Sequence, residues 1–111
     1  MLSQDLALAE YKRWCDYPAL DEETKRALAA MQGDADTILM RFGASMSFGT
    51  AGLRSTMYPG TACMNDYTVA QATQGIAALI QREGGSERGV AIAYDSRNHS
   101  KDFAEVAAEV L

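Results

Sequence analysis

The sequence predicts an α/β domain in residues 45–111, preceded by a helical segment in residues 1–44. Two observations support this fold class. From residue 46 onward, stretches typical of strands and of helices alternate in the order strand, helix, strand, helix, which is typical of α/β units with right-handed crossovers. Before residue 45 the sequence indicates helices, although the apolar residues of the first stretch fit one helical face only in part. We therefore expect a sheet domain with a helical cap in front of it.

The cap is predicted to contain two or three helices. Residues 4–16 form the first, which ends before Pro18 because the residue preceding a proline is pushed out of the α region. Asp21 is an expected N-cap for the second helix, and a short third helix covers Asp36–Phe42. None of these stretches carries a spaced set of His, Cys or carboxylate residues, so structural support is the expected role.

The α/β part begins with a strand over residues 46–57 that is interrupted by glycines and turns at Tyr58-Pro59-Gly60. A helix follows, capped by Asn65 and ended by Gly84-Gly85. Its apolar stripe has the spacing of one helical face and consists of Val69, Ala72, Ile76, Leu79 and Ile80.

The run Val90–Tyr94 is short and continuously apolar, which predicts a strand buried on both faces. The polar loop Asp95–His99 follows it, at the edge where α/β sheets place their ligands. Ser100 is an expected cap for a last helix, whose apolar face contains Phe103, Val106, Ala107 and Val110. No strand follows to cover that face, so we expect an incomplete sheet and a chain that is part of a larger protein.

Composition excludes several classes of function. Fifteen acidic residues against ten basic ones give a net charge of −5, which argues against sequence-independent binding of nucleic acid. The apolar runs are too short for a membrane span, and the N-terminus lacks the basic start of a signal peptide. Cys15 and Cys63 have no CxxC spacing and are expected to be free thiols in a reducing cytoplasm.

The strongest candidate site is the segment Phe48–Arg54, in which Gly49 and Gly52 bracket Thr50 and Ala51. Glycines allow backbone amides to approach a ligand, and arginine offers a planar fork of donors that suits phosphate. The alternative is a surface arginine paired with a carboxylate. The segment is not a Walker loop, because no Gly-Lys-Ser/Thr follows it. It is not a dinucleotide-binding fingerprint either, because its glycine spacing differs and it does not lie between a strand and a helix.

Asp95 and Arg97 form a second candidate, since they follow the predicted buried strand. They either bind a ligand and orient a catalytic loop or form a local ion pair that shapes the turn. One aspartate without a second carboxylate makes no metal site. His99, the only histidine, has no nucleophile beside it and is expected to be a solvated loop residue.

Several motifs in order resemble the α-D-phosphohexomutases, the phosphoglucomutase and phosphomannomutase superfamily. The opening motif Phe48–Arg54 carries the resemblance first. It continues in the segments 57–61, 64–69 and 90–97, and upstream in Trp14, Asp16, Arg41 and Phe42, which look like the branch that also contains phosphopentomutase-like members.

The resemblance implies a three-layer α/β/α domain I with a mixed sheet, in an enzyme of four domains. It implies phosphoryl transfer between C1 and C6 of a hexose phosphate through a phosphoserine, with Mg²⁺ and glucose 1,6-bisphosphate as cofactors. Arg54, Thr50 and Gly52 would contact the substrate, and Asp95 and Arg97 would line the cleft. The remaining domains of the enzyme are the implied partners.

The sequence also departs from the family pattern. The Thr-Ala-Ser-His-Asn-Pro-type serine loop is absent and would lie beyond Leu111, so we expect these 111 residues to lack a catalytic nucleophile, a metal site and mutase activity. Ser55 stands where glycine is usual, at a position where the backbone can need a positive φ. Cys63 replaces a common arginine. The alternative to a mutase is a non-catalytic α/β module that forms homo-oligomers through an exposed sheet edge.

Overall fold

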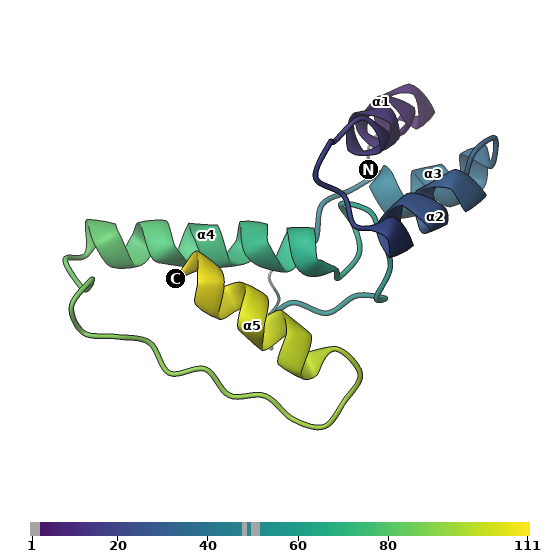
Figure 1. Ribbon diagram of the computed structural model, residues 1–111. Coiled ribbons are helices and arrows are strands. Elements are labelled where there is room, and N and C mark those ends of the chain that lie inside the picture. The colour runs from purple at the N-terminus through teal and green to yellow at the C-terminus, as the bar shows by residue number, and fades with distance from the viewer. Residues whose placement is uncertain (1–2, 48, 50–51) are drawn as a thin grey trace. The chain divides into compact units, whose positions relative to one another are not determined.

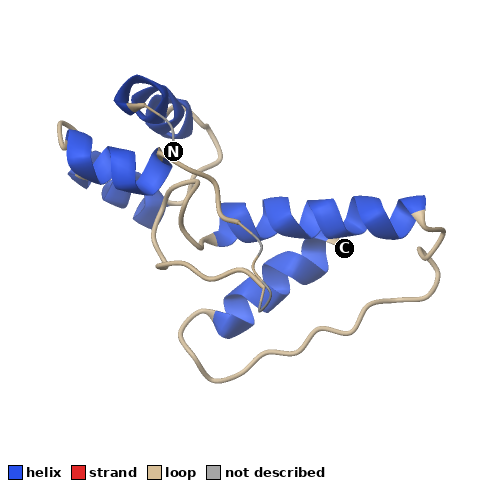
Figure 2. Ribbon diagram, turned by 180° about the vertical axis from the view of Figure 1, so that it is seen from behind, coloured by secondary structure: helices blue, strands red, loops and turns tan. Residues whose placement is uncertain are grey.

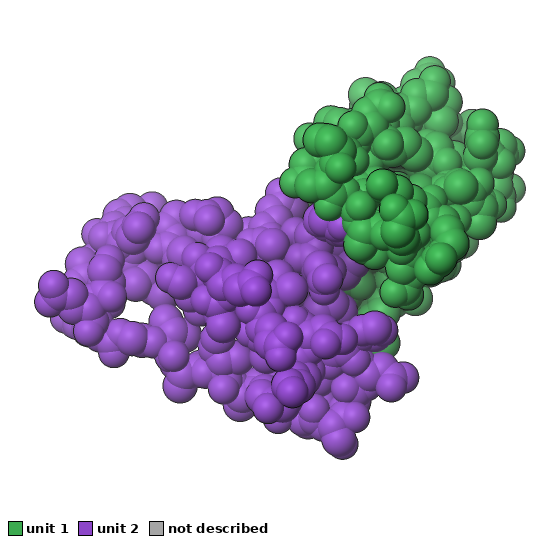
Figure 3. Space-filling view, in the orientation of Figure 1, with its two compact units in different colours: residues 1–64 green, residues 65–111 purple. Residues whose placement is uncertain are grey.

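The computed structural model describes residues 3–47, 49 and 52–111 and forms two compact units, residues 1–64 and 65–111 (Figure 3). Five helices run through the described residues (Figure 1). No helix among them has both the length and the apolar composition needed to cross a membrane. The predicted domain boundary after residue 44 stays a prediction.

Unit 1 contains three helices, each of which begins at a capping side chain. They are α1 (Gln4–Cys15), α2 (Glu22–Ala30) and α3 (Ala35–Phe42). The side chains of Ser3, Asp21 and Asp34 accept hydrogen bonds from the backbone N–H groups of Leu6, Thr24 and Thr37, respectively. These caps satisfy N–H groups that a helix leaves without an internal partner. The sequence predicts two or three helices here, and the structure contains three.

The core of unit 1 is built around Phe42, the last residue of α3, whose side chain is fully buried. The rings of Tyr11 and Trp14 on α1 meet it edge-on, at centroid distances of 5.7 and 5.4 Å. Leu28 on α2 is also buried, and its carbonyl oxygen accepts a hydrogen bond of 2.5 Å from the Tyr11 hydroxyl. Aromatic packing therefore fixes the C-terminal end of α3 against α1.

The chain after α3 turns back onto the end of that helix. The backbone N–H of Ala62 donates to the Arg41 carbonyl oxygen at 3.0 Å. Gly60, with φ +135°, lies so close that a Cβ atom on it would be 2.4 Å from the same oxygen. Thr61 adds a hydrogen bond of 2.7 Å from its hydroxyl to the Ala44 carbonyl. Glycine at position 60 permits this close approach, and the hydrogen bonds of Thr61 and Ala62 hold the Tyr58–Gly60 turn against the end of α3.

Unit 2 contains α4 (Asp66–Arg82) and α5 (Ser100–Val110), which pack against each other (Figures 1 and 2). Asn65 caps α4, as predicted, and forms a reciprocal capping box with Thr68. The long loop between the two helices is exposed. Phe103, Val106 and Val110 on α5 are half-buried, so their face is not left without cover as the sequence suggested.

The predicted fold class is wrong for this chain, because the structure is helical and the described residues contain no strand (Figure 2). The predicted mixed sheet of an α/β/α domain is reduced to two isolated bridges, Gly49 with Gly52 and Met57 with Met64. Residues 90–94 make no backbone hydrogen bond to any described residue. A strand exists only through pairing with a neighbour, so this apolar run remains an exposed, unpaired segment.

The start of α5 also differs from the prediction. His99, with φ 63°, occupies the N-cap position, and its side chain does not cap the helix. The Ser100 hydroxyl accepts instead from the backbone N–H of Asp95 at 3.0 Å. The predicted cap therefore organises the preceding loop rather than the helix.

Replacing Gly60 by alanine is expected to destabilise unit 1 by about 2 kcal/mol or more, because a Cβ collides with the Arg41 carbonyl and φ is positive. Urea unfolding followed by Trp14 fluorescence measures this change. Gly75→Ala is the control, since nothing lies within 4 Å of a Cβ at that helical position and alanine stabilises helices by up to about 1 kcal/mol. Equal midpoints for Gly60→Ala and the native chain would contradict the close packing.

Candidate functional site

Two backbone hydrogen bonds join Gly49 and Gly52, the two glycines of the motif. Gly49 donates its N–H to the Gly52 carbonyl at 2.9 Å, and Gly52 donates back to the Gly49 carbonyl at 3.1 Å. Gly52 has φ +98°, a conformation that favours glycine. Phe48, Thr50 and Ala51 lie outside the described residues, so the predicted role of Thr50 stays a prediction.

Arg54 follows these glycines with its side chain exposed. Within the described part of the chain, its guanidinium takes part in no ion pair or hydrogen bond. The alternative of a surface arginine paired with a carboxylate therefore finds no support. An exposed guanidinium that no carboxylate of the chain neutralises is able to bind a phosphate group.

Residues 58–63, which follow Arg54 in the chain, contact Arg41 through side chains whose interaction the sequence did not predict. The Arg41 guanidinium stacks over the Tyr58 ring, 4.0 Å from its centroid, and its Nη1 lies 3.8 Å from the Cys63 Sγ. Cys63 is buried. The Arg41 Nε is buried and has no hydrogen-bond partner among the described residues. The cation–π contact with Tyr58 stabilises the charge of the guanidinium.

Asp95 and Arg97 form a local ion pair in unit 2. The Arg97 Nε is 2.9 Å from the Asp95 Oδ2, and the Arg97 backbone N–H donates to the Asp95 Oδ1 at 3.0 Å. These hydrogen bonds, the backbone one first, hold the pKa of Asp95 below its ordinary value. The Arg97 side chain is 87% exposed, so pairing leaves most of its guanidinium in contact with solvent.

The two predicted halves of the site belong to different units. Arg54 and Gly52 lie in unit 1, whereas Asp95 and Arg97 lie in unit 2. The prediction that they face one ligand therefore stays a prediction. His99 is exposed, and its Nδ1 lies 3.1 Å from the Asp102 carboxylate. The described residues contain no group of three or more His, Cys, Asp or Glu side chains able to hold a metal ion.

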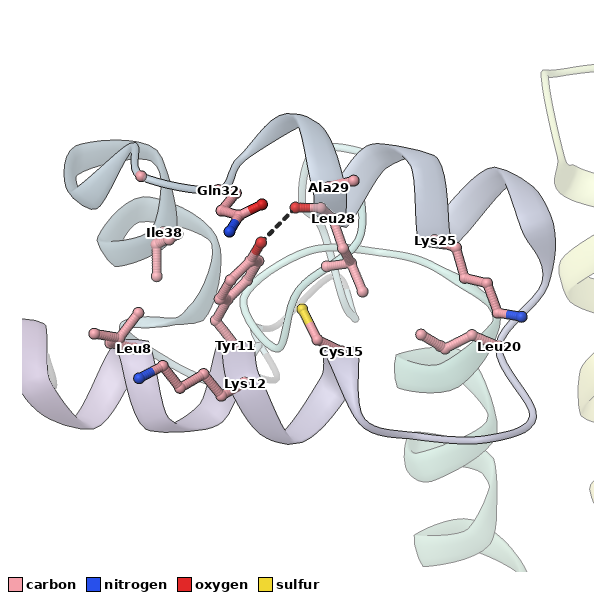
Figure 4. A pocket seen from close by; sticks show the side chains of 11 residues that line it. Leu8, Tyr11, Lys12, Cys15, Leu20, Lys25, Leu28, Ala29, Gln32 and Ile38 are labelled. Carbon is pink, nitrogen blue, oxygen red and sulfur yellow. Dashed lines mark hydrogen bonds between the residues drawn. The ribbon is translucent and has the colours of Figure 1, made fainter.

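Unit 1 also contains a pocket of about 450 Å³ that the sequence did not indicate (Figure 4). Its lining is mainly apolar and comes from all three helices and the turn after α2. Burial raises the pKa of Tyr11 to about 12, and a hydrogen bond with Cys15 adds to the shift. The Tyr11 hydroxyl already donates to the Leu28 carbonyl, so it is not available as a proton donor to a ligand.

Comparison with known proteins identifies the class to which this motif belongs. Residues 45–111 match the family model described as phosphoglucomutase/phosphomannomutase, alpha/beta/alpha domain I. The chain therefore belongs to the phosphoglucomutase/phosphomannomutase family, and the resemblance noted in its motifs is confirmed.

Among the relatives, the phosphopentomutase of Mus musculus is 38% identical over 94% of this chain. The glucose 1,6-bisphosphate synthase of Mus musculus is 34% identical over 96%, and the phosphomannomutase of Mycoplasmoides pirum 29% identical over 90%. The chain spans 18% of the length of each of these relatives. No solved structure matches it significantly.

The turn at Asp95 is expected to weaken in acid. Because the folded pKa of Asp95 is lowered, its ionised form stabilises the turn above the ordinary value of 3.8, and this contribution is lost as the pH falls through the folded pKa. An NMR titration of the Arg97 amide should show a midpoint below 3.8, and Asp95→Asn should abolish the transition. A midpoint at 3.8 or above would contradict the hydrogen-bonded geometry.

Proposed function

We propose that the chain is part of a phosphosugar mutase that moves a phosphoryl group between C1 and C6 of a hexose phosphate, and that Arg54 binds a phosphate group of the sugar. One observation carries this proposal. Arg54 is exposed, follows the hydrogen-bonded glycines Gly49 and Gly52, and makes no ion pair with any described residue. Membership of the phosphoglucomutase/phosphomannomutase family supports it.

The chemistry suits these residues, because phosphoryl transfer depends on positioning and on neutralising charge on the phosphoryl oxygens. Arg54 can offer two parallel N–H donors to one phosphate. Gly52 lets the backbone approach the ligand without a side chain in the way. Arg97, oriented by Asp95, presents further donors to solvent and is proposed to face the same cleft.

The nucleophile and the metal are proposed to come from other parts of a mutase. No serine in this sequence stands in a Thr-Ala-Ser-His-Asn-Pro-type loop. The described residues do not fit a Mg²⁺ site, so no step is assigned to the metal here. We therefore propose that these 111 residues bind a hexose bisphosphate such as glucose 1,6-bisphosphate without turning it over, and that the mutase acts in the cytoplasm.

A pentose phosphate is the alternative substrate within the same superfamily. The phosphopentomutase of Mus musculus is more similar to this chain than the phosphomannomutase of Mycoplasmoides pirum, at 38% against 29% identity. Comparing a hexose 1,6-bisphosphate with a pentose 1,5-bisphosphate in the same titration separates the two, because tighter binding of the pentose would favour the phosphopentomutase-like branch.

Replacing Arg54 by alanine is expected to weaken binding of glucose 1,6-bisphosphate about tenfold, because a charge-assisted bidentate contact is lost. Isothermal titration of the native chain and the variant measures this, and a coupled assay on the same samples should show no turnover. Arg88→Ala, at an exposed arginine of the loop in unit 2, is the matched control and should bind as the native chain does. Equal affinity of Arg54→Ala would remove Arg54 from the site.

A second candidate function is self-association, favoured by the segment 90–94. Val90, Ile92 and Tyr94 occupy alternate positions and are 51%, 41% and 59% exposed. The backbone of this segment has no hydrogen-bond partner among the described residues. Exposed apolar side chains on an unpaired extended backbone favour pairing with a second copy.

Self-association should appear in sedimentation equilibrium as a molar mass that rises with concentration. Ile92→Lys is expected to keep the chain monomeric, since a charge on such a segment opposes pairing. Lys101→Ala, at an exposed polar position on α5, is the control and should not change the mass. A native chain that stays monomeric at every concentration would rule out this candidate.

A further inference from the structure

The residue after Arg54 is tied to the body of unit 1 by its side chain. The Ser55 hydroxyl donates to the Ala62 carbonyl oxygen at 2.6 Å. Ser55 does not have the positive φ that a glycine at this position can adopt, since His99 is the only non-glycine residue with positive φ among the described residues. The departure from glycine therefore brings a hydrogen bond and no backbone strain.

Ala62 in turn is fixed to helix α3. Its N–H donates to the Arg41 carbonyl at 3.0 Å, where Gly60 also packs. The Arg41 side chain reaches the same segment through Tyr58 and Cys63. Two hydrogen bonds therefore connect the end of α3 to the residue next to Arg54, by way of the two polar groups of the Ala62 backbone.

We propose that Ser55 is a positioning residue that holds Arg54 in place for phosphate. This inference rests on the proposed function of Arg54. The tether limits the motion of the backbone that carries the guanidinium, so less conformational entropy is lost when an anion binds. The bond is solvent-exposed, and water replaces part of it when it breaks, so the effect of its loss is modest.

Trypsin cleavage of the Arg54–Ser55 bond measures the tether without any ligand, because cleavage requires local opening of the segment. Ser55→Ala is expected to speed cleavage at this bond about fivefold, the effect of one hydrogen bond. Ser55→Thr keeps the hydroxyl and should restore the native rate. Unstructured peptides of residues 52–58 with serine, alanine or threonine at position 55 correct for any preference of trypsin for the residue after the cleaved bond. Ser47→Ala is the matched control in the full chain.

Titration with glucose 1,6-bisphosphate then tests the positioning role. Ser55→Ala should bind a fewfold more weakly than the native chain, and Ser55→Thr should bind as the native chain does. Unchanged cleavage in Ser55→Ala, or faster cleavage with unchanged affinity, would overturn the proposal. If the native chain binds no bisphosphate, the proposed function of Arg54 fails and the positioning role fails with it, whereas the cleavage rates still report whether the tether exists.

Discussion

The carbonyl oxygen of Arg41 is the point on which the arrangement of the motif depends. It lies at the end of α3, next to Phe42, the residue around which the core of unit 1 is built. It accepts the hydrogen bond from the Ala62 N–H and lies where a Cβ atom at position 60 would collide with it. The buried Phe42 ring fixes the end of α3, and the Arg41 carbonyl there holds Gly60 and Ala62. The helices of unit 1 therefore support the candidate site directly.

The helices could be predicted from the sequence because their signals are local. Asp21 and Asn65 accept hydrogen bonds from N–H groups within three residues, and such caps can be recognised without knowing the rest of the fold. The strand predicted at 90–94 is wrong, because the signal for a strand is not local in this way. An apolar run shows a preference for burial, but a sheet needs a neighbouring backbone, and no described residue provides one here.

The residues of the candidate site could be predicted from the sequence. The contacts that hold these residues in place could not. Gly52 and Arg54 stand out by residue type, and Gly52 has the positive φ that glycine permits. For Asp95 and Arg97 the sequence predicts either a ligand site or a local ion pair, and the structure contains the ion pair. From the sequence Ser55 is only a departure from glycine, because its hydrogen-bond partner is the backbone carbonyl of Ala62, which residue type does not reveal.

The uneven distribution of buried apolar side chains has a consequence for how the chain opens. Among the described residues, all buried apolar side chains lie in unit 1, while unit 2 buries only the threonines Thr68 and Thr73. Slow exchange of amide hydrogens with deuterated solvent depends on burial and on cooperative opening. The most slowly exchanging amides should therefore belong to α1, α2 and α3. The amides of α4 should exchange faster, although α4 is the longest helix.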